Sequence, residues 1–131
     1  MNTMQLKAAK IILFIAALYN MFWGGVISVY PQLILFGNAP TTYMLILIRC
    51  IGMLVGVYGI AYYFASRDVQ RYWPLVLVGL IGKVLGPIGA VYYVWLGTLE
   101  PQFLWVNVFN DLIWLYPFGW IVYLGWKNEK A

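Results

Sequence analysis

The chain has 131 residues, enough for one domain, and it is far more apolar than a soluble protein. Hydrophobic residues make up 64% and charged residues 9%, against about 45–50% and about 25% in soluble domains. A globule of this size cannot bury so much apolar surface, and eight scattered basic residues do not make a nucleic-acid interface. The composition therefore disfavours a soluble enzyme, a disordered chain and a nucleic-acid-binding domain, and it favours a bilayer.

Residue types that are scarce narrow the chemistry further. The sequence has no histidine, one cysteine (Cys50) and four acidic residues. This chain alone therefore cannot supply a bis-histidine haem site, a zinc site, a histidine-based triad or an internal disulfide. We expect no cofactor, no metal and no catalytic residue.

Four long apolar segments follow one another along the chain, at residues 11–30, 43–64, 73–96 and 103–125. Each has about 20 residues, enough to cross a hydrocarbon core of about 30 Å as a helix. The first is too long for the core of a signal peptide, so we expect it to be retained. The predicted fold is an all-α membrane protein, with residues 1–131 as a single four-transmembrane-helix antiparallel bundle.

Basic residues outside the four apolar segments lie at only one end of the predicted bundle. They are found before the first segment, between the second and third, and after the fourth. Residues 31–42 and 97–102 contain no lysine or arginine. The positive-inside rule then places both termini in the cytoplasm, which predicts a multi-pass membrane protein with cytoplasmic termini. The apolar middle of 31–42 fits either a short interfacial helix, acting as a lid, or an ordinary loop with a few buried anchors.

Glycines recur at helical spacing in the second and third segments. They are Gly52, Gly56 and Gly59 in one, and Gly79, Gly82, Gly86 and Gly89 in the other. Such stripes let membrane helices approach closely, so we expect these two segments to form a tight hairpin. One stripe facing a second copy of the chain is the alternative. Pro87 also predicts a kink, with the carbonyl of Lys83 released beside it.

Polar residues inside the predicted spans are the candidate site. Charged groups near the bilayer centre cost several kcal/mol each, and they usually face the interior of a bundle. At 1.5 Å per residue, these residues lie about 9 to 20 Å below the outer ends of their helices. We therefore predict one polar, outward-opening pocket. Its residues are Arg49, Lys83, Asp111, Asn20, Asn107 and Asn110, with Tyr19 and Tyr58 as helpers.

The charges of this set suggest both a pairing and a ligand. Asp111 is the only acid in any predicted span, so Lys83 is its obvious partner, and Asn107 lies one turn away on the same face. If Arg49 joins them, the pocket holds two cations and one anion and favours an anionic ligand: a lipid phosphate, a carboxylate or a prenyl phosphate. Alternatively, Arg49 reaches outward to lipid, or it pairs with Asp111 and leaves Lys83 neutral. A purely structural Lys83–Asp111 pair, which fixes how the helices pack, is the other alternative.

Five stretches of the sequence carry a resemblance to a known family: RCIGMLVGVYGI at 49–60, DVQRYWPLVLVGLIGKVLGPIG at 68–89, Tyr19-Asn20, Trp23-Gly24 and Asn110-Asp111. They resemble a family of small four-helix bacterial membrane proteins, which implies a location in the bacterial inner membrane. The architecture is also loosely similar to DoxX-like proteins. Members of the first family sometimes carry the label alkyl hydroperoxide reductase, which implies peroxidatic thiol chemistry. Cys50 lies in an apolar segment with no resolving cysteine, so the residues do not support that activity. Neither resemblance supplies a substrate.

Three functions remain open. The first is a carrier or accessory subunit that binds an anionic lipid-like or isoprenoid ligand. The second is a small ion- or proton-coupled transporter, and the third a membrane-embedded lipid-modifying enzyme that uses Lys83 and Asp111 as an acid/base pair. The expected partner is a membrane lipid or another amphipathic anionic small molecule. A homo-oligomer or a larger membrane complex stays open, and no nucleic acid is expected.

Overall fold

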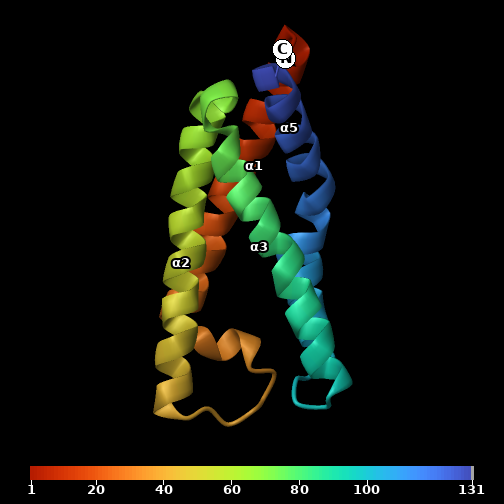
Figure 1. Cartoon of the computed structure of the whole chain (residues 1–131). Coiled ribbons are helices and arrows are strands. Elements are labelled where there is room, and N and C mark those ends of the chain that lie inside the picture. The colour runs from red at the N-terminus through yellow and green to blue at the C-terminus, as the bar shows by residue number, and fades with distance from the viewer. Residues whose placement is uncertain (131) are drawn as a thin grey trace.

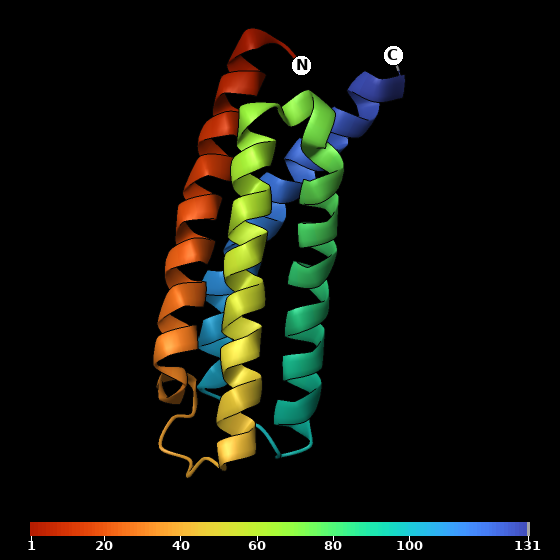
Figure 2. The same ribbon diagram turned by 90° about the vertical axis from the view of Figure 1, so that its left-hand side faces the viewer.

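The computed structural model describes residues 1–130, in which every regular element is a helix and no strand is present (Figure 1). Four helical stretches run antiparallel to their neighbours in sequence, and both termini lie at the same end (Figure 2). In chain order the elements are α1 (Thr3–Val29), the 3-10 turn η1 (Pro31–Ile34), α2 (Thr42–Arg67), α3 (Val69–Trp95), α4 (Phe103–Asn107), the π-helical turn η2 (Val108–Leu112) and α5 (Ile113–Lys130).

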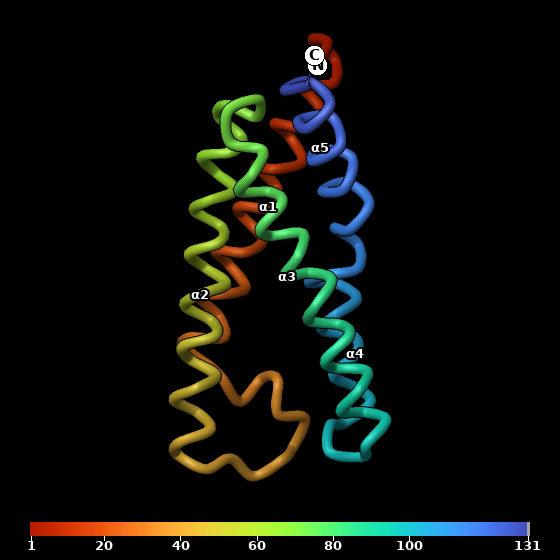
Figure 3. Tube along the Cα trace, in the orientation of Figure 1, coloured from red at the N-terminus to blue at the C-terminus, as the bar shows by residue number. Residues whose placement is uncertain are grey.

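Three of these helices, α1, α2 and α3, are long and apolar enough to cross a membrane. The last stretch, residues 103–130, is helical from end to end, but η2 divides it into α4 and α5 (Figure 3). An all-helical architecture is thus confirmed, with three candidate membrane spans and a fourth helix that is interrupted by its π turn.

The helices extend beyond the predicted apolar segments because their capping residues lie in the polar flanks. The Asn2 side chain accepts a bond of 2.8 Å from the backbone N–H of Gln5, and it begins α1. Asp68 separates α2 from α3, and its carboxylate accepts from the N–H of Arg71 at 3.2 Å. Hydropathy predicts only the apolar part of a helix, whereas capping decides where the helix begins.

The closest helix contact is between α1 and α2. A Cβ atom added to Gly24 of α1 would lie 2.5 Å from the carbonyl oxygen of Gly52 and would collide with the backbone of Gly56. Added Cβ atoms at Gly52 and Gly59 of α2 would likewise collide with α1, so the predicted close packing of the second segment on the third is wrong in its partner. Residue spacing identifies a stripe suited to close packing, but it does not say which helix occupies it.

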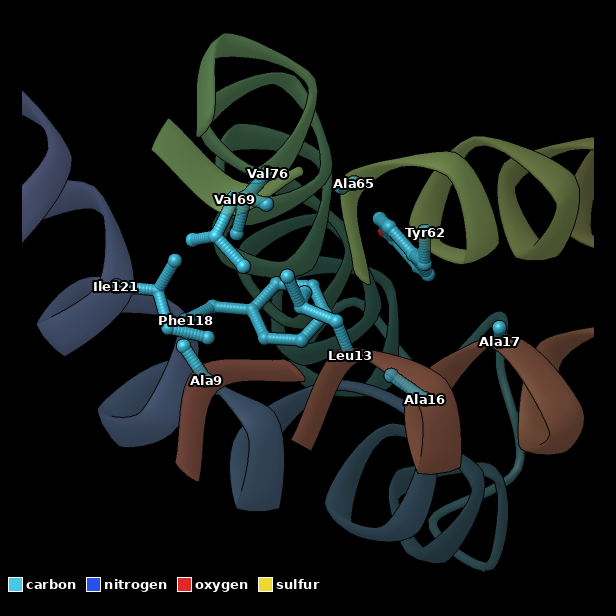
Figure 4. Close-up of a cluster of buried hydrophobic side chains, with 10 residues drawn as sticks. All are labelled: Ala9, Leu13, Ala16, Ala17, Tyr62, Ala65, Val69, Val76, Phe118 and Ile121. Atoms are coloured by element: carbon cyan, nitrogen blue, oxygen red, sulfur yellow. The ribbon is translucent and has the colours of Figure 1, made fainter. Parts of the chain in front are cut away.

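The third and fourth helical stretches form a second pair, closed by larger side chains. The ring of Trp73 covers Gly125 of α5 so closely that a Cβ atom there would collide with it. A buried apolar core joins all four stretches near the end that carries the termini (Figure 4). It consists of Ala9, Leu13, Ala16, Ala17, Tyr62, Ala65, Val69, Val76, Phe118 and Ile121.

A smaller apolar cluster fixes the loop at the opposite end. Ile27, Leu35 and Ile48 are buried together, and Pro31 at the start of η1 is also buried. Residues 31–42 therefore contain a short 3-10 turn held by buried anchors, which combines the two expectations for this loop. Phe36 and Gly37 take positive φ angles of 49° and 85° where the chain turns towards α2.

Candidate functional site

Lys83 and Asp111 lie side by side in the interior, although they form no direct ion pair. The ammonium Nζ of Lys83 donates to the backbone carbonyl of Asn110 at 2.7 Å. Among residues 1–130, no carboxylate oxygen lies within 4.0 Å of a lysine or arginine nitrogen. Both charged residues are buried, at 5% and 8% exposure. The predicted ion pair is therefore not formed, because the ammonium contacts the peptide carbonyl beside the carboxylate instead.

The π turn η2 supplies this carbonyl and the carboxylate together. The N–H of Ile113 reaches back to the carbonyl of Val108, which closes the wide turn around Asn110 and Asp111. Such π turns occur frequently at functional sites. Gly86 of α3 permits the approach, because a Cβ atom there would lie 3.3 Å from Oδ2 of Asp111. Helix α3 thus contacts η2 twice, with the ammonium of Lys83 at Asn110 and with the backbone of Gly86 at Asp111.

Amides and aromatic rings complete the surroundings of the two charges. Nδ2 of Asn107 donates to Oδ2 of Asp111 at 3.0 Å, and Nδ2 of Asn110 approaches Oδ1 at 3.5 Å. The ammonium of Lys83 lies 6.0 Å from the ring centre of Tyr62 and 5.6 Å from that of Phe118. Desolvated cation–π contacts compensate part of the cost of burying a cation.

A cavity of about 190 Å³, called the polar cavity below, opens beside this cluster. Its lining residues are Asn20, Val55, Tyr58, Tyr62, Gly79, Gly82, Lys83, Asn110 and Asp111. They come from α1, α2, α3 and η2, so every helical stretch contributes to it. Tyr58 and Gly82 are exposed, which places the mouth between α2 and α3 near the middle of both helices. This lateral mouth differs from the outward opening that depth alone suggested.

Asn20 links α1 to α2 at the wall of the polar cavity. It is 5% exposed, and its Nδ2 donates to the carbonyl of Val55 at 3.3 Å. Its Oδ1 is buried and accepts no bond from residues 1–130. The buried Oδ1 atoms of Asn107 and Asn110 likewise lack a donor in the described chain.

Arg49 does not join this cluster. Its guanidinium donates to the carbonyl oxygens of Ser28 at 2.8 Å and Val29 at 3.5 Å, at the last turn of α1. Carbonyls at a helix C-terminus have no partner within the helix, and a cation stabilises that end of the dipole. The expectation that Arg49 supplies a second cation to the pocket is therefore wrong, because Arg49 caps the C-terminus of α1. Its pairing with Asp111 is also excluded, since Asp111 has no such contact.

Tyr19 and Asn107 lie next to the polar cavity without lining it. The ring of Tyr19 packs against Trp114 with 5.8 Å between ring centres, and it borders a separate apolar cavity of about 270 Å³ under η1. Asn107 acts through Asp111, as its contact shows. Of the eight residues predicted for the site, the structure thus gathers five around one cavity: Asn20, Tyr58, Lys83, Asn110 and Asp111.

Sequence reasoning missed Tyr62 and Gly82 as parts of this wall. Tyr62 lies four residues after Tyr58, a spacing that puts both rings on one helix face. Their rings are 6.2 Å apart between centres. In the sequence, Gly82 is recognisable only as part of a glycine stripe. Its place at the mouth depends on the absence of a neighbouring helix over that position, which the sequence does not report.

Comparison of the chain with protein-family models, with curated proteins and with solved structures found no match. The resemblance to small four-helix membrane proteins stays a prediction.

Proposed function

We propose that this chain is a multi-pass protein of a bacterial inner membrane, with four spans and cytoplasmic termini. Three helices meet the length and hydropathy of a span, and residues 103–130 lie alongside them as a fourth helical stretch. Every lysine and arginine outside the predicted spans lies at the end of the bundle that carries the termini and the α2–α3 turn. This asymmetry supports the orientation.

Its function is to bind the polar head of a lipid-like or isoprenoid molecule in the polar cavity, as a carrier or as an accessory subunit. One observation carries this proposal: an ammonium, a carboxylate and two carboxamides, of which that of Asn20 is buried, line a cavity halfway along an otherwise apolar bundle. Buried charge in a membrane is costly, and it is the usual mark of a functional site.

The charge of the head differs from the sequence expectation. The anionic preference depended on Arg49, which caps α1 instead. Among the described lining residues, Lys83 is the only cation and Asp111 the only carboxylate, so the two formal charges cancel. An anionic head would therefore find no uncompensated positive charge in the polar cavity.

The ligand enters sideways from the bilayer. Tyr58 and Gly82 stand at the mouth between α2 and α3, and an added Cβ at Gly82 meets nothing within 4 Å. An amphiphile can place its head in the cavity through this mouth while its chain stays in lipid. The cavity volume of about 190 Å³ is below the roughly 300–1,000 Å³ of pockets for whole drug-sized ligands, which also supports capture of a head alone.

Native mass spectrometry of the protein in a mild detergent, followed by lipid analysis of the released adduct, tests this proposal. Gly82→Leu narrows the mouth, and we expect it to reduce the adduct at least tenfold. Gly89→Leu is the matched control, because it lies on the same helix, also has open space around its Cβ and does not line the cavity. Its adduct should equal that of the parent chain.

A parent chain that carries no adduct, even after incubation with membrane lipid extract, contradicts the binding function. Equal loss in the Gly82→Leu and Gly89→Leu variants contradicts the lateral mouth. Thiol labelling tests the topology separately, in a Cys50→Ser background with single cysteines at Thr98 or Asn128. In intact cells an impermeant reagent should reach position 98 and not position 128.

A second candidate, an ion- or proton-coupled transporter, is favoured by the separation of the two charges. Asp111 accepts only from amide groups, while Lys83 bonds a carbonyl. A carboxylate held in this way can take up a proton or a cation without first breaking an ion pair. Flux across liposomes under a pH gradient, lost in Asp111→Asn and kept in Gly82→Leu, would favour transport over lipid binding.

A further inference from the structure

The buried atoms without a partner near the polar cavity are mostly acceptors. They are the Oδ1 atoms of Asn20, Asn107 and Asn110, and the only donor with them in the described chain is Nε1 of Trp114. A buried acceptor without a donor costs stability, so folded proteins keep few of them. Asn20 and Asn110 line the cavity, and Asn20 is more than nine-tenths buried.

The orientation of these carboxamides is fixed by their nitrogen contacts. Nδ2 of Asn20 donates to the carbonyl of Val55, and Nδ2 of Asn107 donates to the carboxylate of Asp111. Turning either amide over would place oxygen against oxygen. The free Oδ1 atoms are therefore acceptors by geometry, and exchanging O and N does not convert them into donors.

Lys83 adds the opposite requirement at the same wall. Its ammonium has three N–H groups, of which one donates to the carbonyl of Asn110. A group that fills the cavity must donate to carboxamide oxygens and accept from an ammonium. A hydroxyl does both. A carboxylate or phosphate dianion only accepts, and it would face Asp111 and two free carbonyl-type oxygens.

We infer that the polar cavity takes an uncharged head carrying hydroxyl groups, which donate to Asn20 and Asn110 and accept from Lys83. This inference rests on the proposed function and names the chemical class of its ligand. The ligand is a neutral hydroxylated amphiphile, of the kind in which a small polyol or alcohol ends a hydrocarbon chain.

Three probes with the same oleoyl chain test the head directly: 1-monooleoylglycerol, methyl oleate and oleate. The first has two hydroxyls, the second only acceptors and the third a negative charge. Titration of each into the detergent-solubilised full chain, read by native mass spectrometry, gives three dissociation constants. We expect monooleoylglycerol to bind about tenfold or more tightly than methyl oleate or oleate, because two free acceptors gain donors.

In the Asn20→Leu variant, the dissociation constant of monooleoylglycerol should rise to that of methyl oleate. Asn128→Leu is the matched control, since Asn128 lies outside the cavity near the C-terminus. If Asn20→Leu does not fold, the ranking of the three probes on the parent chain still decides. Tightest binding of oleate, or equal binding of all three, overturns the inference and leaves the lipid-binding function standing. If the parent chain binds none of the three probes more tightly than the Gly82→Leu variant does, both the inference and the lipid-binding function are overturned.

Discussion

Glycine has a different structural role in the α1–α2 pair from the one it has in the pair formed by α3 and residues 103–130. Along α1–α2, the glycines bring backbone against backbone, and Gly24 has no room for a single added carbon. Along α3, Gly82 and Gly89 face open space, and Gly86 faces the carboxylate of Asp111. The first pair is a close-packed seam stabilised mainly by dispersion, and the second surrounds buried charge.

This contrast teaches that a small-residue stripe has no fixed meaning. In lipid, close packing gains dispersion energy only where a partner backbone fills the space. Where none does, the same stripe leaves access to whatever lies behind the helix. On α3 that is the polar cavity, so α1 and α2 form a close-packed wall of the cavity, and α3 and residues 103–130 carry its two charges.

The largest effect is expected from removing one charge. Asp111→Leu leaves the ammonium of Lys83 buried without its compensating carboxylate, which should lower the free energy of unfolding by about 3–5 kcal/mol. The double variant Lys83→Met/Asp111→Leu should recover most of this loss. Unfolding in detergent followed by circular dichroism measures both. A double variant no more stable than Asp111→Leu would show that the two charges are not coupled.

Forcing open the close-packed α1–α2 seam is the next test. Gly24→Ala forces apart α1 and α2, because the added Cβ collides with the α2 backbone, and a loss of about 3 kcal/mol or slightly less is expected. Gly25→Ala is the control, with nothing within 4 Å of its Cβ. Equal midpoints for the two variants would mean that the seam is not the tight half of the molecule.

Arg49→Met separates capping from binding. The loss of its bonds to the last carbonyls of α1 should cost about 1–2 kcal/mol in unfolding free energy. Ligand adducts measured by native mass spectrometry should stay unchanged, because Arg49 does not line the cavity. A selective loss of the adduct at unchanged stability would return Arg49 to the site.

The smallest effect compares two glycines of one helix. Gly89→Ala should raise the free energy of unfolding by up to about 1 kcal/mol, since alanine favours helix and meets no neighbour. Gly86→Ala should raise the free energy of unfolding by less or not at all, because its Cβ would lie only 3.3 Å from Oδ2 of Asp111. Identical changes in the thermal midpoint would place Asp111 further from α3 than the structure does.

Much of the candidate site was predictable from the spans that carry its residues. Charged and amide side chains in apolar helices must face one another, so Lys83, Asp111, Asn20 and Asn110 could be expected on a shared wall. Arg49 could not be placed in this way, since a long cation is satisfied equally by a carboxylate or by the end of a neighbouring helix. The choice depended on where α1 ends, which hydropathy does not report.

The amino-acid sequence by itself determined the helical class, the apolar segments and the set of polar residues inside them, because these follow from composition and from period along one chain. The tertiary structure alone decided three things: that α2 packs on α1, that η2 presents the carbonyl of Asn110 to Lys83, and that the cavity opens between α2 and α3. Each of these depends on how the four stretches rotate about their own axes. In lipid that rotation is set by shape and polar contacts between helices, since every face is comparably apolar.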